Sequence, residues 1–393
     1  MNIAIIAPYV TLPGENGSNR FYLLCECFSK LDNVILLTSS FSHYYKKQRK
    51  AKRSNARFSV NLIFEPGYKN NVSISRVLSH VRLAFGFYIA LHRLLRKKEI
   101  DLYYVAFPDL GVLLYLSIMK RFYKYKVVID IQDMWPEAFI MVTDKIPNFI
   151  YRVMKFFRKK IMSCASLIIT VSSTYSNIIR KELPSSLILT SYLGSTVYDF
   201  KYLLAKTTRT VNKKKILIGY SGSSGQSYDL ITISDVISDL IINGYSFKLM
   251  IFSSESQQLS LLKKTKNSKL IIRKMIPHID LMKELQQCDL LLNPVVDVSA
   301  ASVTNKMCDY ASVSRPILDC QNNKELDDIF SEMLIKYKSF DKKSIVSALN
   351  IYINNIDRYT SMADKKSEKL RAMFNKKRTN IKIVNSVRKL TNI

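Results

Sequence analysis

Short apolar segments alternate with longer segments of helical periodicity along this chain, and the alternation starts a second time after a polar segment at residues 206–214. Such alternation is typical of parallel sheets with crossover helices. The expected strands of the first series are Ile3 to Ala7, Val34 to Thr38, Leu102 to Ala106, Val127 to Ile131, Leu167 to Val171 and Leu187 to Thr190. Those of the second series are Lys215 to Tyr220, Phe247 to Phe252, Leu270 to Ile272, Leu290 to Asn293 and Ile317 to Asp319. We therefore expect an α/β protein with two doubly wound, Rossmann-like domains that face a central cleft.

The second start of the pattern also divides the chain. We expect an N-terminal Rossmann-like domain over residues 1–205 and a C-terminal one over residues 206–364. Residues 365–393 have helical periodicity and carry ten Lys or Arg residues against the single acid Glu368. This segment is expected to form a closing helix and a basic tail.

The chain is strongly basic, which restricts what it binds. Its 393 residues include 60 Lys and Arg against 31 Asp and Glu, a formal net charge of +29. Nucleic acid, an anionic membrane surface and sugar phosphates are the expected kinds of partner. The charge is spread nearly evenly over both halves and no nucleic-acid-binding motif is found, so a nucleic-acid binder is disfavoured.

The six cysteines form no C-x-x-C pair and have no His cluster beside them, so we expect no metal site and a reduced, cytoplasmic protein. The opening MNIAIIAPYV has the pattern of a buried strand rather than of a signal peptide. The apolar stretch from Leu102 to Met119 is interrupted by Pro108 and Asp109, so we expect no membrane span.

A glycine-containing turn follows the first expected strand, where Gly14 and Gly17 precede Arg20 and a helix that starts at Phe21. Glycines in a strand-to-helix turn let backbone N–H groups approach a phosphate or a sugar hydroxyl at the positive end of the helix. The spacing is not G-x-G-x-x-G, which disfavours a dinucleotide site. The alternative is a tight loop without a ligand.

A second turn of this kind opens the C-terminal domain, between a strand that ends near Tyr220 and a helix that starts at Leu230. Gly222, Ser223 and Gly225 lie in this turn. Glycine and serine at this position suit a diphosphate. Two such loops facing one cleft support a ligand site more strongly than either loop alone.

The strand from Leu290 to Asn293 leads to a further candidate, the segment that contains Asn305, Lys306 and Asp309. If a helix starts near Ser302, the N–H groups of its first turn and the Lys306 ammonium point at the same place, and together they stabilise a leaving diphosphate. Asp309, one turn further on, would accept hydrogen bonds from ribose hydroxyls. The alternative is that Lys306 and Asp309 form a solvated i, i+3 pair.

The segment from Asp130 to Glu137 holds the single Trp of the chain, Trp135, and three carboxylates at the carboxyl end of an expected strand. Doubly wound domains bind their ligands at that end of the strands. Two other interpretations are that Trp135 fills the core under the loop and that Asp130 caps the local backbone.

Taken together, these stretches resemble the retaining GT-B glycosyltransferases of family 4, especially the branch of bacterial O-antigen and capsule synthesis. The resemblance covers nearly the whole chain, and DIQDMWPE and NKMCDYASVSRPIL are its most specific motifs. It implies transfer of a hexosyl or N-acetylhexosaminyl group from a nucleotide-sugar donor to a polyprenyl diphosphate-linked oligosaccharide. It also implies retention of anomeric configuration without a cofactor.

The resemblance implies roles for individual residues as well. Lys306 would neutralise the donor diphosphate, and Asp309 would hold the ribose. Asp133 matches a region where many relatives carry a His or Asp beside the reacting sugar, so Asp133 and Lys306 are the candidate catalytic residues. The candidate donor-binding residues are Gly222, Ser223, Gly225, Asn305, Lys306 and Asp309. The candidate acceptor-binding residues are Gly14, Gly17 and Arg20.

Two positions depart from the family pattern. Ala301 stands eight positions before Asp309, where the family has a Glu that contacts the hexose, so that contact is absent or is made by backbone N–H groups. Tyr228 and Asp229 replace the usual Lys-Gly pair, which removes one expected phosphate-binding cation. A nucleotide-sugar epimerase of the same fold and a catalytically inactive scaffold therefore stay open as alternatives.

A lipid-linked acceptor requires a surface that contacts an anionic bilayer. From Ile150 to Met162, apolar residues at helical spacing alternate with basic ones, the pattern of an interfacial amphipathic helix. The basic residues are Arg152, Lys155, Arg158, Lys159 and Lys160. The segment from Leu78 to Lys98 has a similar pattern. We expect a peripheral location on the inner face of the cytoplasmic membrane, with ordinary core-facing helices as the alternative.

Overall fold

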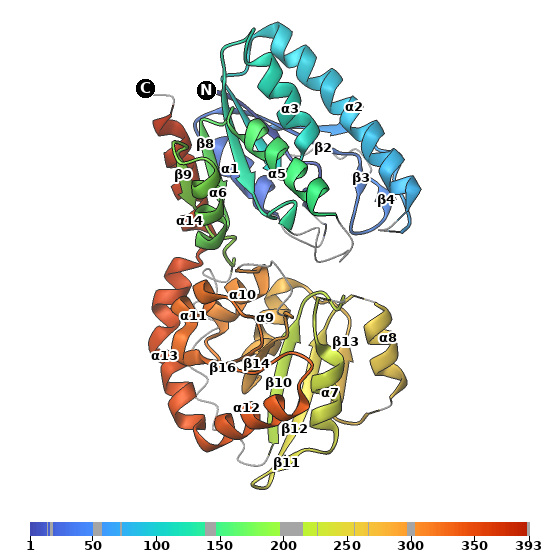
Figure 1. Ribbon diagram of the computed structural model, residues 1–393, viewed down its shortest axis with the longest axis vertical. Coiled ribbons are helices and arrows are strands. Elements are labelled where there is room, and N and C mark those ends of the chain that lie inside the picture. Colours follow the sequence, from blue (N-terminus) through green and yellow to red (C-terminus); the bar gives the residue numbers. More distant parts are fainter. Residues whose placement is uncertain are drawn as a thin grey trace. The chain divides into compact units, whose positions relative to one another are not determined.

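A computed structural model of the chain shows two compact units, one made of Met1–Ser191 and Asn380–Ile393 and the other of Tyr192–Thr379 (Figure 1). We call the first unit 1 and the second unit 2. The residues described are 1–13, 15, 19–49, 57–70, 73–137, 147–196, 215–225, 227–254, 256–265, 267–296 and 303–390. The boundary expected at 205/206 lies outside these residues. The expected closing segment 365–393 is divided between the two units.

Unit 1 is built on a seven-stranded sheet with the order β5-β2-β1-β6-β7-β8-β9. Each neighbouring pair that the structure describes in this sheet is parallel. The strands are β1 (Asn2–Ile6), β2 (Asn33–Ser39), β5 (Ser59–Ile63), β6 (Leu102–Phe107), β7 (Lys126–Ile131), β8 (Leu167–Thr170) and β9 (Ile188–Thr190). A separate antiparallel pair is formed by β3 (Phe41–Ser42) and β4 (Lys47–Gln48). The strand order reverses beside β1, which is the doubly wound arrangement.

Helices pack against this sheet and complete its core (Figure 1). They are α1 (Arg20–Phe28), α2 (Ile74–Lys97), α3 (Leu110–Met119), α5 (Asn148–Met162), α6 (Ser173–Glu182) and α14 (Lys376–Lys389). The side chains of Ser73, Asp109 and Ser172 cap α2, α3 and α6 by accepting hydrogen bonds from backbone N–H groups. The C-terminal residues that belong to the buried core of unit 1 are Ile383, Val384, Val387 and Leu390. α14 and Leu390 therefore contribute to this core.

Unit 2 repeats the arrangement. Its sheet has the order β11-β12-β10-β14-β15-β16, and β13 also pairs with β12. The strands are β10 (Lys215–Ser221), β11 (Ile241–Ile242), β12 (Tyr245–Phe252), β13 (Leu270–Arg273), β14 (Leu290–Asn293), β15 (Ile317–Asp319) and β16 (Leu334–Lys336). The antiparallel pair is β11 with β12, and the other described pairs are parallel. The strand order reverses between β10 and β14.

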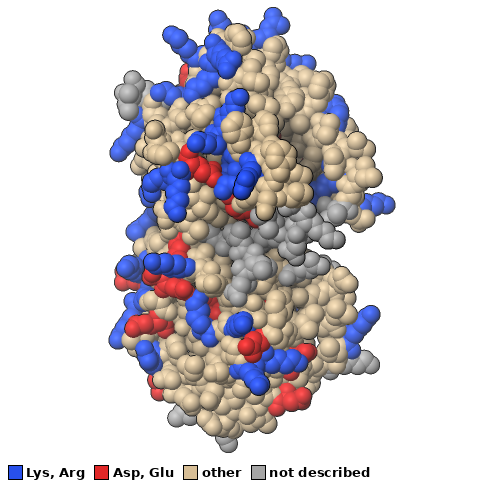
Figure 2. All heavy atoms as spheres, in the orientation of Figure 1, with Lys and Arg blue, Asp and Glu red and all other residues tan. Residues whose placement is uncertain are grey.

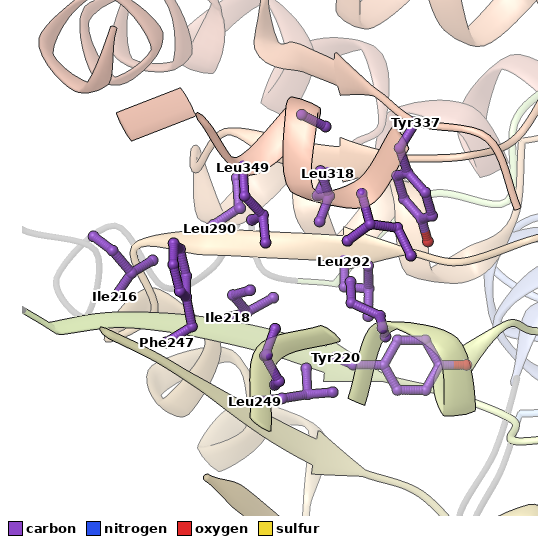
Figure 3. Packing of buried hydrophobic residues seen from close by; sticks show 14 of the residues in the cluster. Ile216, Ile218, Tyr220, Phe247, Leu249, Leu290, Leu292, Leu318, Tyr337 and Leu349 are labelled. Carbon is purple, nitrogen blue, oxygen red and sulfur yellow. The ribbon is translucent and has the colours of Figure 1, made fainter. Parts of the chain in front are cut away.

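The core of unit 2 is formed by side chains from distant parts of the sequence. Figure 3 shows Ile218 of β10, Leu249 of β12 and Leu292 of β14 in this core, and all three are fully buried. The helices of unit 2 are α7 (Leu230–Asp239), α8 (Gln257–Lys264), α9 (His278–Gln286), α10 (Asn305–Val313), α11 (Lys324–Phe330), the 3₁₀ turn η2 (Ser331–Met333), α12 (Lys342–Asn354) and α13 (Ile356–Met373). This packing aligns the carboxyl ends of β10, β14 and β15 at one edge of the sheet.

Each strand expected from the sequence is present, and the expected α/β doubly wound class is confirmed for both units. The strands β3, β4, β5, β11 and β16 were not expected. β3, β4 and β11 have two residues each. β5 and β16 are edge strands; β5 contains no fully buried residue and β16 ends in the exposed Lys336, so neither is a continuous buried apolar segment.

One helix among the described residues, α2, is long and apolar enough to cross a membrane by length and composition. Its residues that are buried in unit 1 recur every four positions and are Ser79, Leu83, Phe87, Leu91 and Leu95. This spacing places one face of α2 against unit 1, as in a surface helix of a soluble domain.

Candidate functional site

The strand order of the unit 2 sheet reverses between β10 and β14. Doubly wound folds bind ligands beside such a reversal, at the carboxyl ends of the strands. Gly222, in the loop after β10, has a φ of +140°, a backbone conformation that favours glycine. Ser223 and Gly225 are exposed, whereas Ser224 between them is buried and donates a hydrogen bond to Ser256. The loop therefore leaves Ser223 and Gly225 accessible, and their role in donor binding stays a prediction.

Lys306 lies in the first turn of α10 and is buried, with 7% of its surface exposed. Its Nζ lies 4.3 Å from the centre of the Tyr228 ring and 4.9 Å from that of Tyr220. Among the residues that the structure describes, Nζ has no hydrogen-bond partner. Burial lowers the pKa of Lys306 to about 7, and the smaller effects of Cys320 and Asp319 oppose this shift. A buried ammonium without hydrogen bonds is costly, and a bound anion would remove that cost.

Among the described residues, no side chain caps the N-terminus of α10. The helix begins at Asn305, which is exposed, and not at the expected start near Ser302, a residue outside the described part of the chain. Thr304 is the N-cap residue, but its Oγ1 is buried and has no partner in the described ranges. N–H groups at the positive end of a helix attract anions when no cap satisfies them. The first turn of α10 therefore combines backbone N–H groups that Thr304 does not cap with the buried ammonium of Lys306.

The carboxylate of Asp309 is held by two other side chains of unit 2. Its Oδ1 accepts a hydrogen bond of 2.7 Å from Ser195 and lies 3.0 Å from Nε2 of His278. Burial lowers the pKa of His278, but the hydrogen bond and the charge of Asp309 outweigh this effect, so the pKa is raised. The sequence did not indicate Ser195 or His278, because both are distant from α10 along the chain and neither lies in a recognisable motif.

The alternative of a solvated Lys306–Asp309 pair is wrong, because Lys306 is buried against the rings of Tyr220 and Tyr228. The structure also explains one departure from the family pattern. Tyr228, at a position where the family has Lys, contributes a ring face to the Lys306 ammonium, which is a favourable cation–π geometry. Asp229 caps α7 by accepting a hydrogen bond from the backbone N–H of Thr232. The other departure, Ala301, lies outside the described residues.

A buried polar network lies at the ends of β14, β15 and β16. Asn293 donates a hydrogen bond of 2.7 Å to Asp319, and Lys336 donates one of 2.8 Å to the same carboxylate. Burial raises the pKa of Asp319, and Lys336 opposes this shift. The network fixes a carboxylate whose charge acts on Lys306. Among the described residues, no group of three or more His, Cys, Asp or Glu side chains is arranged to hold a metal ion.

The predicted acceptor residues belong to unit 1. Gly14 and Gly17 lie outside the described residues. Arg20 is 1% exposed and donates two hydrogen bonds, of 2.9 and 3.2 Å, to the carboxylate of Asp130. Tyr104 donates a third, of 2.6 Å, to the same group. Asp130 therefore pairs with Arg20 rather than capping the local backbone. Arg20 fastens α1 to β7, and a direct contact between Arg20 and an acceptor stays a prediction.

Asp133 follows the end of β7 by two residues and is exposed. Partial desolvation by the surrounding protein raises the pKa of its carboxyl group. Trp135 is half-buried rather than enclosed in the core, and its backbone carbonyl accepts a hydrogen bond of 2.8 Å from Arg158. The loop thus exposes a carboxylate at the carboxyl edge of the unit 1 sheet, and the catalytic role of Asp133 stays a prediction.

The helix α5 differs in one respect from the expected interfacial helix. Arg158 was expected among the surface cations, but its side chain is fully buried and forms ion pairs with Glu137 and Glu182. Lys155 lies 3.7 and 3.4 Å from the same two carboxylates. Helical periodicity could not reveal these acids, because neither belongs to α5. The basic residues of α5 that are exposed are Arg152, Lys159 and Lys160.

Two Rossmann-like units, each with the strand order of a doubly wound sheet, define the GT-B fold, and solved structures confirm this fold for the chain. Sucrose-phosphate synthase from Thermosynechococcus elongatus matches with a TM-score of 0.74 and 11% identity over 100% of this chain and 99% of its own. HepE of Anabaena, in complex with UDP and glucose, matches with a TM-score of 0.65 and 11% identity over 99% and 100%.

WaaG, a glycosyltransferase involved in lipopolysaccharide biosynthesis, matches with a TM-score of 0.63 and 11% identity over 96% of this chain and 99% of its own. No family of known proteins and no curated protein matches the chain by sequence. At these identities the likeness shows the fold, and the chemistry has to be argued from the residues of this chain.

Proposed function

We propose that the protein is a retaining glycosyltransferase that moves a sugar from a nucleotide-sugar donor to a lipid-linked oligosaccharide. The observation that carries the proposal is the Lys306 ammonium, which is buried without a hydrogen-bond partner among the described residues. It lies in the first turn of α10, whose N-cap residue Thr304 makes no capping bond, and a nucleoside diphosphate is an anion that such a turn binds. The Anabaena HepE structure, which has the same fold and holds UDP, supports this choice of ligand.

The charge on the donor changes during transfer. The bond between the anomeric carbon and the diphosphate oxygen breaks, and the acceptor oxygen forms a new bond to that carbon on the same face and loses its proton. Negative charge develops on the departing diphosphate. Donors fixed in place before the reaction stabilise that charge more in the transition state than in the ground state. In this proposal Lys306 and the N–H groups of α10 are those donors.

The other predicted site residues complete the proposal. Gly222, Ser223, Gly225 and Asn305 lie at the carboxyl edge of unit 2 and contact the donor. Asp309 accepts hydrogen bonds from the ribose hydroxyls, and Asp133 acts beside the reacting sugar from unit 1. The donor therefore depends mainly on unit 2, and the acceptor on unit 1.

We also propose that the chain belongs to family 4 and acts in the synthesis of a surface polysaccharide, an O-antigen or a capsule. The motifs DIQDMWPE and NKMCDYASVSRPIL support this assignment. The likeness of fold to WaaG, which is involved in lipopolysaccharide biosynthesis, agrees with it. The acceptor in this proposal is a sugar chain on a polyprenyl diphosphate.

Such an acceptor places the protein on the inner face of the cytoplasmic membrane. Large apolar side chains are exposed on α2 and α5, namely Ile74, Val77, Leu78, Val81, Phe85, Phe149, Ile150, Phe156 and Phe157. The helix α3 contacts both α2 and α5. Figure 2 shows more Lys and Arg than Asp and Glu on the visible face of unit 1. Apolar side chains that insert into the interface and cations that attract anionic lipids are the two components of peripheral binding.

Calorimetric titration with a panel of nucleoside diphosphates tests the donor site. At least one should bind to the wild type and to Lys343→Met, which changes an exposed lysine of α12, but not to Lys306→Met. If none binds to the wild type, the proposal is wrong. Interconversion of a nucleotide sugar without an acceptor would instead indicate the epimerase, and binding without turnover of any nucleotide sugar would indicate the inactive scaffold.

A further inference from the structure

Four aromatic side chains of unit 1 form a closed ring of contacts that the donor chemistry does not use. Tyr9 follows β1, His43 follows β3, Tyr68 lies after β5, and His80 belongs to the second turn of α2. The ring centres are 5.3 Å apart for Tyr9 and His43, 5.8 Å for His43 and Tyr68, 5.6 Å for Tyr68 and His80, and 5.8 Å for His80 and Tyr9. We call this set the four-ring cluster.

Hydrogen bonds join side chains of the four-ring cluster that come from different segments of the chain. The Tyr9 hydroxyl lies 2.6 Å from Nε2 of His80, and the Tyr68 hydroxyl pairs with Nδ1 of His43. Tyr9 is nevertheless 44% exposed, and both histidines are half-buried. The cluster is therefore an ordered surface that a ligand can reach, rather than part of the closed core.

Two cations lie against the cluster. Nζ of Lys46 is 4.4 Å from the centre of the Tyr68 ring and 3.3 Å from Nδ1 of His43. Cζ of Arg76, in the first turn of α2, is 5.5 Å from the Tyr68 ring centre. Both cations and the N-terminus of α2 therefore contribute positive potential to one small region of the surface.

Among the described residues, the carboxylate at the cluster is that of Glu65, and it is already engaged inside the protein. Glu65 is fully buried and accepts hydrogen bonds from Ser39 and Ser79. One of its oxygens lies 4.0 Å from Nε2 of His80. Within the part of the chain that the structure describes, Lys46 and Arg76 therefore leave an excess of positive charge at the cluster.

The surroundings lower the pKa of both histidines in the cluster. Burial, followed by the charges of Lys46, Arg76 and His80, lowers the pKa of His43 to about 4. Burial also lowers the pKa of His80, with added effects of Arg76 and Lys46. Both rings are therefore neutral at pH 7 and can donate or accept one hydrogen bond each, while Lys46 and Arg76 supply the charge.

An apolar stripe starts at the same place. The exposed side chains on α2 next to Arg76 and His80 are Ile74, Val77, Leu78, Val81 and Phe85, with 80%, 62%, 64%, 62% and 57% of their surface exposed. They continue along α2 from its first turn, where the cations lie. A cationic and aromatic surface cluster at the start of an apolar stripe matches a ligand with an anionic head and an apolar chain.

We propose that the four-ring cluster, with Lys46 and Arg76, binds the diphosphate of the lipid-linked acceptor, and that the first part of its apolar chain lies along the exposed stripe of α2. This inference rests on the proposed function and names the acceptor site within it. It assigns acceptor binding to residues other than Gly14, Gly17 and Arg20. The exposed ring of Tyr9 offers a face for the first sugar of the acceptor.

Binding of farnesyl diphosphate, measured by calorimetry with the donor site saturated by a nucleoside diphosphate, tests this inference. The double variant Lys46→Ala/Arg76→Ala should bind at least about tenfold more weakly, as expected when charged hydrogen bonds are lost. Lys47→Ala, which removes the adjacent exposed lysine on β4, should bind like the wild type. Equal affinity of the wild type and the double variant would overturn the inference.

One further ligand, inorganic diphosphate, and one further variant, Leu78→Gln/Val81→Gln, separate binding of the diphosphate head from binding of the apolar chain. The wild type should bind inorganic diphosphate more weakly than farnesyl diphosphate. The variant Leu78→Gln/Val81→Gln should bind inorganic diphosphate as well as the wild type does, but it should bind farnesyl diphosphate more weakly than the wild type does. Farnesyl diphosphate that binds no better than inorganic diphosphate would exclude a role for α2. If nucleoside diphosphates fail to bind while farnesyl diphosphate binds through Lys46 and Arg76, the proposed function fails and the lipid site stands.

Discussion

The ammonium nitrogen of Lys306 lies 4.3 Å from the centre of the Tyr228 ring. Tyr228 stands at a position where the family 4 glycosyltransferases that the sequence resembles have a lysine, so an aromatic face takes the place of a second cation beside Lys306. The ring stabilises the ammonium but offers it no hydrogen-bond acceptor. Lys306 therefore keeps its donors for a ligand, at the cost of a destabilised charge in the free protein.

This arrangement predicts opposite effects of one substitution on stability and on binding. Lys306→Met keeps the volume between Tyr220 and Tyr228 and removes a buried charge, so the unliganded variant should melt at the same temperature as the wild type or higher. Added nucleoside diphosphate should raise the melting temperature of the wild type but not that of the variant. Thermal melts with and without the nucleotide measure both effects, and a variant still stabilised by the nucleotide would remove Lys306 from the site.

The lowered pKa of Lys306 predicts that nucleotide binding takes up protons. Burial brings the pKa to about 7 in the free protein, and a bound diphosphate favours the charged form and raises it. The contribution of Lys306 to affinity is therefore complete below pH 7 and is lost as the pH rises above 7. Calorimetry in buffers of different ionisation enthalpy should detect proton uptake at pH 8, and Lys306→Met should not show it.

His278 should report on the charge of Asp309. Because Asp309 raises the pKa of His278, Asp309→Asn should lower that pKa while the hydrogen bond from Ser195 is kept. Stability from this pair is present at low pH and is lost as the pH rises through the raised pKa of His278. The ring signals of the four histidines in an NMR titration show the shift, with His92 as the internal reference. An unchanged His278 titration would mean that the ion pair does not form in solution.

The sequence predicted the central strands of the two sheets better than it predicted edge strands such as β5. Buried strands such as β1 and β14 are continuous apolar segments, because both faces of a parallel sheet are covered by helices. β5 lies at an edge of its sheet and has partly exposed residues, so its pattern is weaker. Residues 365–393 were expected to form a closing helix and a basic tail, and the apolar residues between the basic ones, such as Ile383 and Val387, pack into the core of unit 1.

The site was predictable as far as it lies in local motifs. The segment around Lys306 marks a helix start after a strand, which a pattern of neighbouring residues can reveal. The rings of Tyr220 and Tyr228 around Lys306, and the contact of His278 with Asp309, depend on tertiary packing between segments that are far apart in sequence. The same reason explains why Arg158 was expected on the surface.

Arg158 should matter for folding rather than for membrane binding. Its buried guanidinium neutralises Glu137 and Glu182. Arg158→Met leaves both carboxylates without this cation, so the free energy of unfolding should fall by about 3 to 5 kcal/mol. Chemical denaturation measures this change. Lys155→Met removes a weaker and partly exposed partner of the same acids and serves as the matched control, with a smaller loss expected.

The exposed cations of α5 should govern membrane binding. Arg152→Glu/Lys159→Glu/Lys160→Glu should release the protein from anionic vesicles, and added salt should do the same to the wild type, because the attraction is screened. A matched triple reversal in unit 2, at Lys248, Lys264 and Lys343, should leave binding intact. Equal sedimentation of both triple variants with vesicles would show that α5 is not the contacting surface.

The proposed function requires that unit 2 binds a nucleotide sugar and that the chain transfers the sugar to a lipid-linked acceptor. Purified protein should be incubated with a panel of radiolabelled nucleotide sugars and a bacterial lipid extract, and label in the lipid fraction should be measured. We expect transfer from at least one donor, with one nucleoside diphosphate released per sugar and the α or β configuration of the donor kept. Transfer should fall by about 10²-fold or more in Lys306→Met, as for other fixed charge stabilisers. A fully active Lys306→Met, or no transfer from any donor while the lipid extract serves a control enzyme, would contradict it.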